Sequence, residues 1–423
     1  MTTRTTMIGC RLAAALVLFA VVGDARADDW PQWLGPKRDG STGEKVAPWK
    51  EDQPPKVLWR QAISAGYSSP VIAGGKVFVH AVVSGKDEEE VIALDLAKGD
   101  VLWKDSYARP RFRSILGTGP RATPTVSGKQ LFTMGINGVL SCYDTETGRR
   151  AWQVDLFSKF EAQVPQYAVC CSPLVVGNRV IVSVGGKGRC VVALDTNTGE
   201  IAWQSLDDAT STSSAVLFAG GERLPGASPD VVFLTPLRLV GLDPLDGTLR
   251  WEHSMVFQPR GTSPTPVAIG DKVVASTQAH GAIAVQVSKK GDSLTANAAW
   301  QDQNQKSYFS SGVALKDVVL LVTNALEPLP TTSIACLEGK TGKLLWVKEK
   351  AGYFHAGLIR TGDDKVLALN DSGLLTLLEI DGNGSKELAR AKVCGGTLVT
   401  PALANGKLVT RDDKELVCSQ IGE

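Results

Sequence analysis

The stretch ALDLAKGDVLW at residues 93–103 decides the fold, because its pattern returns four more times along the chain. The further copies are CYDTETGRRAW at 142–152, ALDTNTGEIAW at 193–203, GLDPLDGTLRW at 241–251 and CLEGKTGKLLW at 336–346. Each copy has a small residue, an acidic residue two positions on, a glycine four further and a tryptophan after another four. Repetition with fixed internal spacing indicates an architecture built from one repeated supersecondary unit.

The chemistry of this motif predicts a β-hairpin. The residues before the acid alternate or run apolar, as in Val191-Val192-Ala193-Leu194, which is typical of a buried strand. An aspartate can accept hydrogen bonds from the backbone that follows it, and glycine supplies the positive φ that ends such a turn. A second strand then leads to the tryptophan.

A second strand pair precedes each hairpin. Examples are SPVIAGGKVFV at 69–79, TPTVSGKQLFT at 123–133 and SPLVVGNRVIV at 172–182. Proline near the start of the first strand suits an edge strand, which has unpaired backbone groups. The repeating unit is therefore a meander of four short strands, which is the blade of a β-propeller.

Counting the first strands predicts an all-β, eight-bladed propeller of four-stranded antiparallel blades. The predicted blade starts are Ser69, Thr123, Ser172, Ser214, Ser263, Ser311, His355 and Thr400. The last blade lacks a fourth strand, whereas KVLWRQA at 56–62 has strand character and no blade before it. We therefore expect the ring to close by pairing this N-terminal strand with the last blade, which leaves no gap between the first and last blades.

Three blades depart from the repeat. The fifth ends at Trp300 but lacks the acid-to-glycine spacing, so Gly291 is expected in a longer connection. The seventh has no tryptophan, and the fourth carries an insertion at 220–229.

The N-terminus has the three parts of an export signal. Arg4 and Arg11 are basic, 12–22 is an apolar run too short to span a bilayer, and Ala25-Arg26-Ala27 is a cleavage site. We expect a signal peptide over 1–27 with cleavage after Ala27, and hence a periplasmic or secreted protein. Residues 28–55 form a predicted N-terminal strap, followed by a single propeller domain over 56–423. The strap tryptophans Trp30, Trp33 and Trp49 are expected to pack across the propeller wall.

The composition narrows the possible partners. The chain has 45 basic and 44 acidic residues with no basic stripe, which argues against a nucleic-acid ligand. After the N-terminal run no later segment is apolar enough to cross a bilayer. The chain also lacks a phosphate-binding loop, a zinc-protease motif and a nucleophile elbow, so no catalytic residue is predicted.

The motif resembles the tryptophan-docking motif of propellers of the pyrroloquinoline-quinone (PQQ)-like repeat family, over nearly all of the mature chain. WPQW at 30–33 and GPRATPT at 119–125 are similar to the PQQ-like repeat proteins of planctomycetes. The resemblance implies that each docking tryptophan packs between blades, against the small residue of a neighbouring motif. These tryptophans are Trp103, Trp152, Trp203, Trp251 and Trp346. The family includes quinoprotein alcohol dehydrogenases, which hold PQQ and a metal ion on the axis, and assembly propellers of the BamB type, which carry no cofactor.

The cysteines have two interpretations. Cys142, Cys336 and Cys418 occupy the small-residue position, where a buried thiol acts as a small apolar group. The adjacent pair Cys170-Cys171 resembles the vicinal disulfide that quinoprotein dehydrogenases place against PQQ. The first blade has Ser68-Ser69 at the same place, so the pair can also be a simple replacement for two serines, and the strain stored in a vicinal disulfide favours this second interpretation.

Residues in the connections between blades form the predicted ligand site. A cluster of arginines lies between the first two blades, and further polar residues lie in equivalent connections. Together they suggest a basic, hydroxyl-lined funnel for an anionic ligand or acidic peptide. The predicted ligand-binding residues are Arg113, Arg121, Cys170, Cys171, Arg260, Tyr308 and His355. Solvated loop charges without a ligand are the alternative.

A PQQ enzyme also needs calcium ligands and an aspartate base. Asp302, Asn304 and Asn324 are the candidates by position, but they do not assemble the family's ligand set. We therefore predict no metal site and no cofactor, with PQQ and calcium as the alternative.

The sequence predicts an exported, non-catalytic binding or scaffold propeller that engages a protein or envelope component through its loop face. The alternative is a PQQ- and calcium-dependent alcohol or sugar dehydrogenase. A carbohydrate-binding role, using Tyr167, Tyr308, Tyr353 and Phe354 for stacking, is a third hypothesis.

Overall fold

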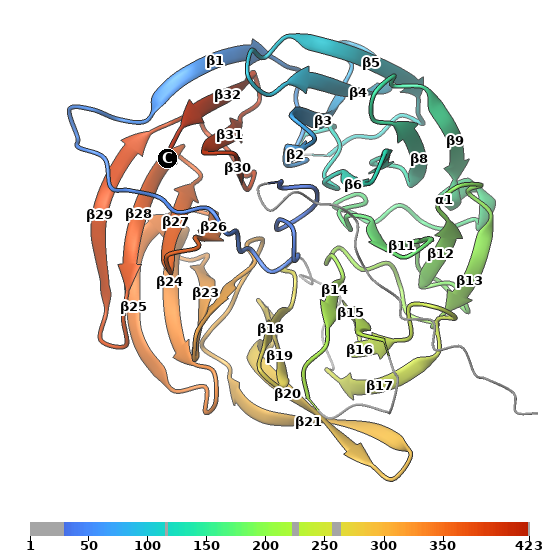
Figure 1. The fold of residues 1–423 in the computed structure, drawn as a ribbon. Coiled ribbons are helices and arrows are strands. Elements are labelled where there is room, and N and C mark those ends of the chain that lie inside the picture. The colour runs from blue at the N-terminus through green and yellow to red at the C-terminus, as the bar shows by residue number, and fades with distance from the viewer. Residues whose placement is uncertain (1–28, 115–116, 222–227, 256–263, 422–423) are drawn as a thin grey trace, which may run out of the picture.

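A computed structural model describes residues 29–114, 117–221, 228–255 and 264–421. Eight four-stranded antiparallel sheets form a ring, so the predicted eight-bladed propeller is confirmed (Figure 1). The predicted signal peptide 1–27 and Arg260 lie outside the described residues. No helix within the described part of the chain is long and apolar enough to cross a membrane.

The blades follow one another in chain order. Blade 1 has β2 (Val71–Ala73), β3 (Lys76–Val82), β4 (Glu88–Asp95) and β5 (Val101–Ala108). Blade 2 has β6 (Thr125–Ser127), β7 (Gln130–Met134), β8 (Val139–Asp144) and β9 (Arg150–Asp155), followed by the short helix α1 (Leu156–Lys159). Blade 3 has β10 (Leu174–Val176), β11 (Arg179–Ser183), β12 (Val191–Asp195) and β13 (Ile201–Ser205). Blade 4 has β14 (Val216–Phe218), β15 (Asp230–Leu234), β16 (Arg238–Leu242) and β17 (Leu249–Ser254).

The second half repeats this order. Blade 5 has β18 (Val267–Ile269), β19 (Lys272–Thr277), β20 (Gly281–Lys290) and β21 (Ser293–Asp302). Blade 6 has β22 (Val313–Leu315), β23 (Val318–Ala325), β24 (Thr331–Glu338) and β25 (Leu344–Gly352). Blade 7 has β26 (Ala356–Arg360), β27 (Lys365–Asn370), β28 (Leu374–Ile380) and β29 (Ser385–Lys392). Blade 8 has β30 (Ala402–Ala404), β31 (Lys407–Arg411) and β32 (Glu415–Gln420).

The ring closes as the sequence predicts. The N-terminal strand β1 (Lys56–Ala62) pairs antiparallel with β32, with Trp59 opposite Cys418, and supplies the missing outer strand of blade 8. Arg411 reinforces the seam between blades 8 and 1. Its fully buried guanidinium donates to the carbonyl oxygens of Ser68 and His80, each at 2.8 Å. Every blade described in the structure therefore has four strands, and the ring is closed by the pairing of the N-terminal strand with the last blade.

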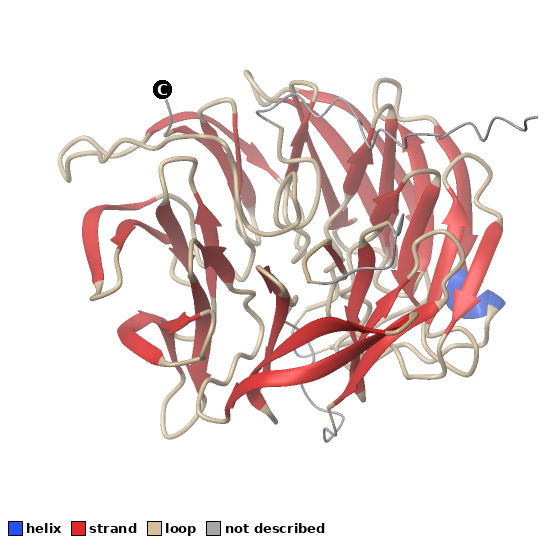
Figure 2. Cartoon of the chain, turned by 60° about the horizontal axis from the view of Figure 1, so that its bottom comes forward, coloured by secondary structure: helices blue, strands red, loops and turns tan. Residues whose placement is uncertain are grey.

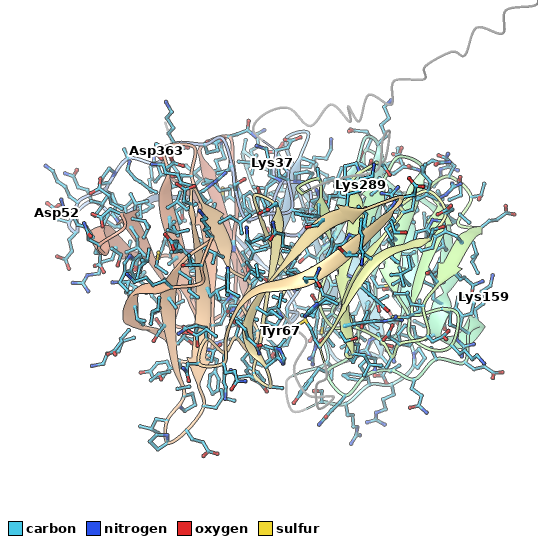
Figure 3. The ribbon with its side chains drawn as sticks, turned by 90° about the horizontal axis from the view of Figure 1, so that it is seen from below. Lys37, Asp52, Tyr67, Lys159, Lys289 and Asp363 are labelled. Atoms are coloured by element: carbon cyan, nitrogen blue, oxygen red, sulfur yellow. The ribbon has the colours of Figure 1, made fainter. Side chains whose placement is uncertain are left out.

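The propeller has two faces (Figures 2 and 3). The first strand of every blade begins at the same face, which we call the connection face. This face carries the links from one blade to the next and the links between the second and third strands of each blade. The opposite face carries the tight turns between first and second strands and the acid-to-glycine turns, and we call it the turn face. Tyr67 lies on the connection face and Lys37 on the turn face (Figure 3).

Tryptophan docking joins neighbouring blades. The Trp103 indole N–H of blade 1 donates to the carbonyl oxygen of Thr145 in blade 2 at 3.0 Å. A Cβ atom on Gly148 would lie 2.5 Å from this indole, so the ring packs directly on the glycine of the next motif. The resemblance had implied packing against the small residue of a neighbouring motif. The small residue Ala93 instead pairs with Trp103 across its own sheet, where a bulge shifts the register.

The same bond recurs around most of the ring. The indole donors are Trp59, Trp103, Trp152, Trp203, Trp300 and Trp346, and the acceptors are the carbonyl oxygens of Leu96, Thr145, Thr196, Pro244, Gly339 and Asp381. Trp59 and Trp300 lie outside the predicted docking set, because the motifs around them are incomplete.

Trp251 belongs to the predicted docking set, but its indole does not bond to the next blade. Its indole N–H donates to the Asp230 carboxylate of its own blade at 2.7 Å, and its ring packs on Gly241. The next blade lacks the acid-to-glycine turn that would receive the indole. There β20 and β21 are ten residues each and meet at Gly291, which has a φ of +61°. The longer connection expected around Gly291 is therefore a tight turn between long strands.

A buried charged network joins blades 1 and 2. The Glu89 carboxylate accepts from the Tyr107 hydroxyl at 2.5 Å and from the Ile136 N–H at 3.0 Å. His80 Nε2 lies 3.4 Å and Arg109 Nε 3.5 Å from the same carboxylate. Burial raises the pKa of Glu89, but the hydrogen bonds from His80, Tyr107 and Ile136 lower it overall. The carboxylate is thus ionised and holds two blades together.

Candidate axial binding site

A ring of hydroxyl groups surrounds the propeller axis where the first strands begin. Thr123 Oγ1 accepts from the Ser69 N–H, Ser172 Oγ from the Thr123 N–H, and Ser214 Oγ from the Ser172 N–H, at 2.9 to 3.1 Å. Farther round the ring, Ser311 Oγ accepts from the Thr265 N–H at 2.9 Å. An innermost strand has no further strand beside it to accept hydrogen bonds from its backbone N–H groups. Each hydroxyl supplies such an acceptor. The recurring Ser/Thr-Pro dipeptide marks some of these hydroxyl positions in the sequence. On its own, the dipeptide predicted only where the first strands begin.

The N-terminal strap closes the axis from the turn face. It begins beside blade 1, where Trp30 and Ile72 exchange backbone hydrogen bonds, and runs over the centre toward blade 7 (Figure 1). Arg38 lies at its centre, 1% exposed. Its guanidinium donates to the carbonyl oxygens of Ser172, Pro173 and Ala215 at 2.6 to 2.8 Å. Burial lowers the pKa of Arg38 to about 10, so it remains charged at neutral pH.

Trp33 is the strap residue that enters the axial channel. Its indole N–H donates to Thr265 Oγ1 of blade 5 at 2.8 Å. The expectation that Trp33 would pack across the propeller wall is wrong, because its side chain lines the cavity at the axis. Trp30, by contrast, is 1% exposed within the core beside blade 1.

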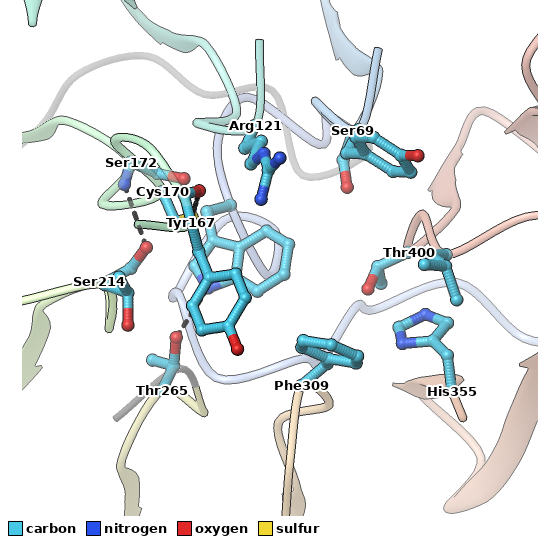
Figure 4. A pocket seen from close by; sticks show the side chains of 14 residues that line it. Ser69, Arg121, Tyr167, Cys170, Ser172, Ser214, Thr265, Phe309, His355 and Thr400 are labelled. Atoms are coloured by element: carbon cyan, nitrogen blue, oxygen red, sulfur yellow. Dashed lines mark hydrogen bonds between the residues drawn. The ribbon is translucent and has the colours of Figure 1, made fainter. Parts of the chain in front are cut away.

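Above Trp33 the connection face holds a cavity of about 130 Å³ (Figure 4). Arg121, Tyr167, Phe309 and His355 converge on it, each from a different connection between blades. The remaining lining residues are Trp33, Tyr67, Ser69, Cys170, Ser172, Thr212, Ser214, Thr265, Leu398 and Thr400. The cavity therefore combines aromatic walls with a polar ring.

Arg121 supplies the positive charge. Its guanidinium carbon lies 5.6 Å from the centre of the Tyr67 ring, in a cation–π contact. Its Nη2 reaches Ser114 Oγ and the Gly117 carbonyl oxygen only at 3.4 Å, and its buried Nε has no hydrogen-bond partner. No carboxylate pairs with it among the described residues.

His355 lies across the cavity and is 4% exposed. Its Nδ1 is 2.7 Å from Ser310 Oγ, which also accepts from the Ala356 N–H. Its buried Nε2 has no partner. Burial lowers the pKa of His355 to about 4, so the ring is neutral at neutral pH.

Both cysteines of the adjacent pair are free thiols in this structure, as are all described cysteines. Cys170 lines the cavity and donates to the Tyr167 carbonyl oxygen at 3.4 Å, whereas Cys171 is buried beside Arg38. Burial raises the pKa of Cys170 to about 11, an effect that Arg121 partly offsets. The Cys170 side chain therefore lines the cavity as a protonated thiol at neutral pH.

The other predicted residues lie elsewhere. Arg113 is exposed in the connection after blade 1 and does not line the cavity. Tyr308 lies next to the cavity residue Phe309, with ring centroids 3.9 Å apart, and contacts Tyr167. The structure thus brings Arg121, Cys170 and His355 together. Sequence reasoning missed Trp33, Phe309 and the hydroxyl ring as site residues.

The residues of this cavity do not fit PQQ with calcium. Calcium prefers six to eight oxygen ligands, including carboxylates, and no described residue lining the cavity is an aspartate or glutamate. Asp302 accepts from the Asn304 N–H at 2.9 Å within its own turn. Asn324 donates to Thr332 Oγ1 and accepts from the Tyr308 N–H. No cluster of three potential metal ligands occurs in the described residues.

The eight blades and the docking tryptophans define a PQQ-like β-propeller. A family model described as "Outer membrane protein assembly factor BamB" matches residues 43–113 and 87–346. The chain belongs to this family.

Two named relatives illustrate the range of sequence similarity. The outer membrane protein assembly factor BamB of Yersinia pestis is 23% identical over 308 residues, which cover 68% of this chain and 71% of the relative. The quinohemoprotein alcohol dehydrogenase ADH-IIG of Pseudomonas putida is 28% identical over 145 residues, covering 32% of this chain but 19% of the enzyme.

Solved structures share the fold. BamB from Moraxella catarrhalis aligns with a TM-score of 0.58 at 16% identity, over 86% of this chain and 98% of that one. Quinohemoprotein alcohol dehydrogenase from Comamonas testosteroni aligns with a TM-score of 0.64 at 13% identity, over 96% and 83%. At these identities the likeness extends to the fold alone.

Proposed function

We propose that this chain is an exported, non-catalytic propeller that binds a protein or another envelope component through its connection face. The supporting observation is a group of exposed apolar side chains on blade 6 and the link to blade 7. Leu329 is 75% and Tyr353 65% exposed, and Leu326 and Phe354 are also exposed. Exposed aromatic and aliphatic side chains of this kind are typical anchors of protein interfaces.

The backbone beneath these side chains is fixed. Asp371 accepts hydrogen bonds from the N–H groups of Tyr353 and Phe354, and Asn324 Nδ2 donates to the Phe354 carbonyl oxygen at 3.1 Å. The aromatic rings are thus presented to solvent on an ordered backbone. A preordered surface loses less conformational entropy when it binds.

Relatives named as outer membrane protein assembly factors support this proposal. A dehydrogenase function finds support in ADH-IIG, but that match covers 19% of the enzyme. None of the described residues that line the axial cavity is a carboxylate of the kind that calcium prefers, and Trp33 lies at its floor.

Affinity capture from the native envelope tests the proposal. The tagged chain is cross-linked in cells, and its protein partners are compared with those of the double variant Leu329→Asp, Tyr353→Asp. The matched control is Leu245→Asp, which changes a 58% exposed leucine on the turn face. We expect defined partners with the unchanged chain and the control, and their loss with the double variant. Equal capture by all three chains contradicts the proposed surface.

A further inference from the structure

We propose that the axial cavity is a binding site for a single carboxylate group carried on a short apolar or aromatic body. The inference does not depend on the protein partner proposed above, because a free acid satisfies the same chemistry. It rests on the charge, the hydrogen-bond donors and the walls of the cavity.

The charge favours one negative group. Arg121 is the cation in the lining, and no described lining residue is acidic. Its interactions are weak for a half-buried guanidinium, because its protein hydrogen bonds are 3.4 Å long and its Nε is unpaired. A guanidinium matches a carboxylate in a planar, two-bond geometry. One guanidinium balances a monoanion and leaves a doubly charged phosphate undercompensated.

The hydroxyl ring supplies donors. Ser172 Oγ and Ser214 Oγ each accept a hydrogen bond from the backbone of a neighbouring blade. Their own hydroxyl protons are therefore free to point into the cavity, since neither hydroxyl donates to a described residue. The hydroxyls of Ser69 and Thr400 also face the cavity with no protein partner in the described part of the chain.

His355 completes the donor set. Ser310 Oγ accepts from the Ala356 N–H, so its hydroxyl proton can be donated to His355 Nδ1. That arrangement places the proton of the neutral imidazole on Nε2, which is buried and unpaired. A buried donor without a partner is costly, and a bound carboxylate oxygen satisfies it.

The aromatic walls and the volume of the cavity limit the size and the chemistry of the apolar part of the ligand. Trp33, Tyr167 and Phe309 present aromatic surface to a cavity of about 130 Å³. This space suits a single small ring or branched side chain rather than a polycyclic cofactor. Such a group occurs in free aromatic acids and at the C-terminal residue of a protein.

Calorimetric titration of the purified chain distinguishes these two sources. The probes are phenylacetate, its neutral analogue phenylacetamide, and the tripeptide Gly-Gly-Phe as free acid and as amide. We expect saturable binding of at least one acid, and binding at least about tenfold weaker for the matching amide. Phenylacetate binding without peptide binding assigns a free acid, whereas peptide-acid binding assigns a protein C-terminus. Either outcome supports the inference.

Two variants connect the binding to the cavity. Arg121→Gln is expected to abolish the preference for acid over amide, and Arg149→Gln, which removes an exposed arginine on the turn face, is expected to leave it unchanged. Thr400→Val keeps the side-chain shape and is expected to weaken acid binding about tenfold. It carries the test if Arg121→Gln does not fold. Failure of both acids to bind overturns the inference, as does equal binding of acid and amide or an unchanged preference in Arg121→Gln.

Discussion

Arg38→Met removes the central anchor of the strap while keeping an apolar side chain of similar length. In the native chain the guanidinium donates to the carbonyl oxygens of Ser172, Pro173 and Ala215. Pro173 keeps a second donor, the Thr125 hydroxyl at 2.7 Å. The carbonyls of Ser172 and Ala215 lose their strong donor in a buried site.

The magnitude follows from these two carbonyls. Each buried acceptor left without a donor costs about 1–3 kcal/mol, so the pair gives about 4 kcal/mol. This energy is lost from the contact between strap and propeller, so the strap is expected to open locally before the ring unfolds. A loss of about 4 kcal/mol corresponds to amide exchange about a thousandfold faster in the strap.

Hydrogen exchange followed by mass spectrometry measures this effect on peptides covering residues 29–46. The strap amides that bond to other segments, such as those of Trp30 and Thr42, report opening directly. Lys37→Met is the matched control, because Lys37 is adjacent and exposed. Exchange in Arg38→Met that equals exchange in Lys37→Met would refute the anchoring role of Arg38.

Three further predictions concern stability and processing. Glu89→Gln is expected to lower the free energy of unfolding by about 3 kcal/mol at pH 7, because the buried partners of Glu89 lose the negative charge of its carboxylate. Since the folded pKa of Glu89 is lowered, its stabilisation is present above the unfolded pKa and is lost as pH falls through the folded pKa. Urea denaturation between pH 7 and pH 3 should therefore show the difference from the native chain shrinking, and a constant difference contradicts it. Gly148→Ala should cost more than Gly128→Ala in the same assay, because both glycines have positive φ but a Cβ meets the Trp103 ring only at Gly148. N-terminal sequencing of the chain exported by its host should begin at Asp28, and an intact N-terminus contradicts the signal peptide.

The sequence predicted the blades because their information is local and repeated. Each hairpin carries its own turn chemistry, such as Asp95 accepting from the N–H groups of Ala97 and Lys98, before Gly99. Closure of the ring was predictable for the same reason, since KVLWRQA at 56–62 has strand character without a partner of its own.

The axial site was only partly predictable, because its contacts join segments far apart in the chain. Arg38 bonds to Ala215, 177 residues away in the sequence, and Trp33 bonds to Thr265, 232 residues away. No periodicity in the sequence indicates either contact. Arg121 and His355 were predicted from their place in the connections. Trp251 shows the converse case, in which a complete motif lacks its docking contact because the next blade has no matching turn.

The most direct test of a non-catalytic propeller is a titration of the purified chain with PQQ and Ca²⁺, coupled to a dye-linked alcohol oxidation assay. The lining of the axial cavity by hydroxyls and one arginine, without described carboxylates, predicts no saturable PQQ binding and no alcohol-dependent dye reduction. Micromolar PQQ binding with turnover, lost in Cys170→Ser, would contradict the account and assign the chain to the quinoprotein dehydrogenases.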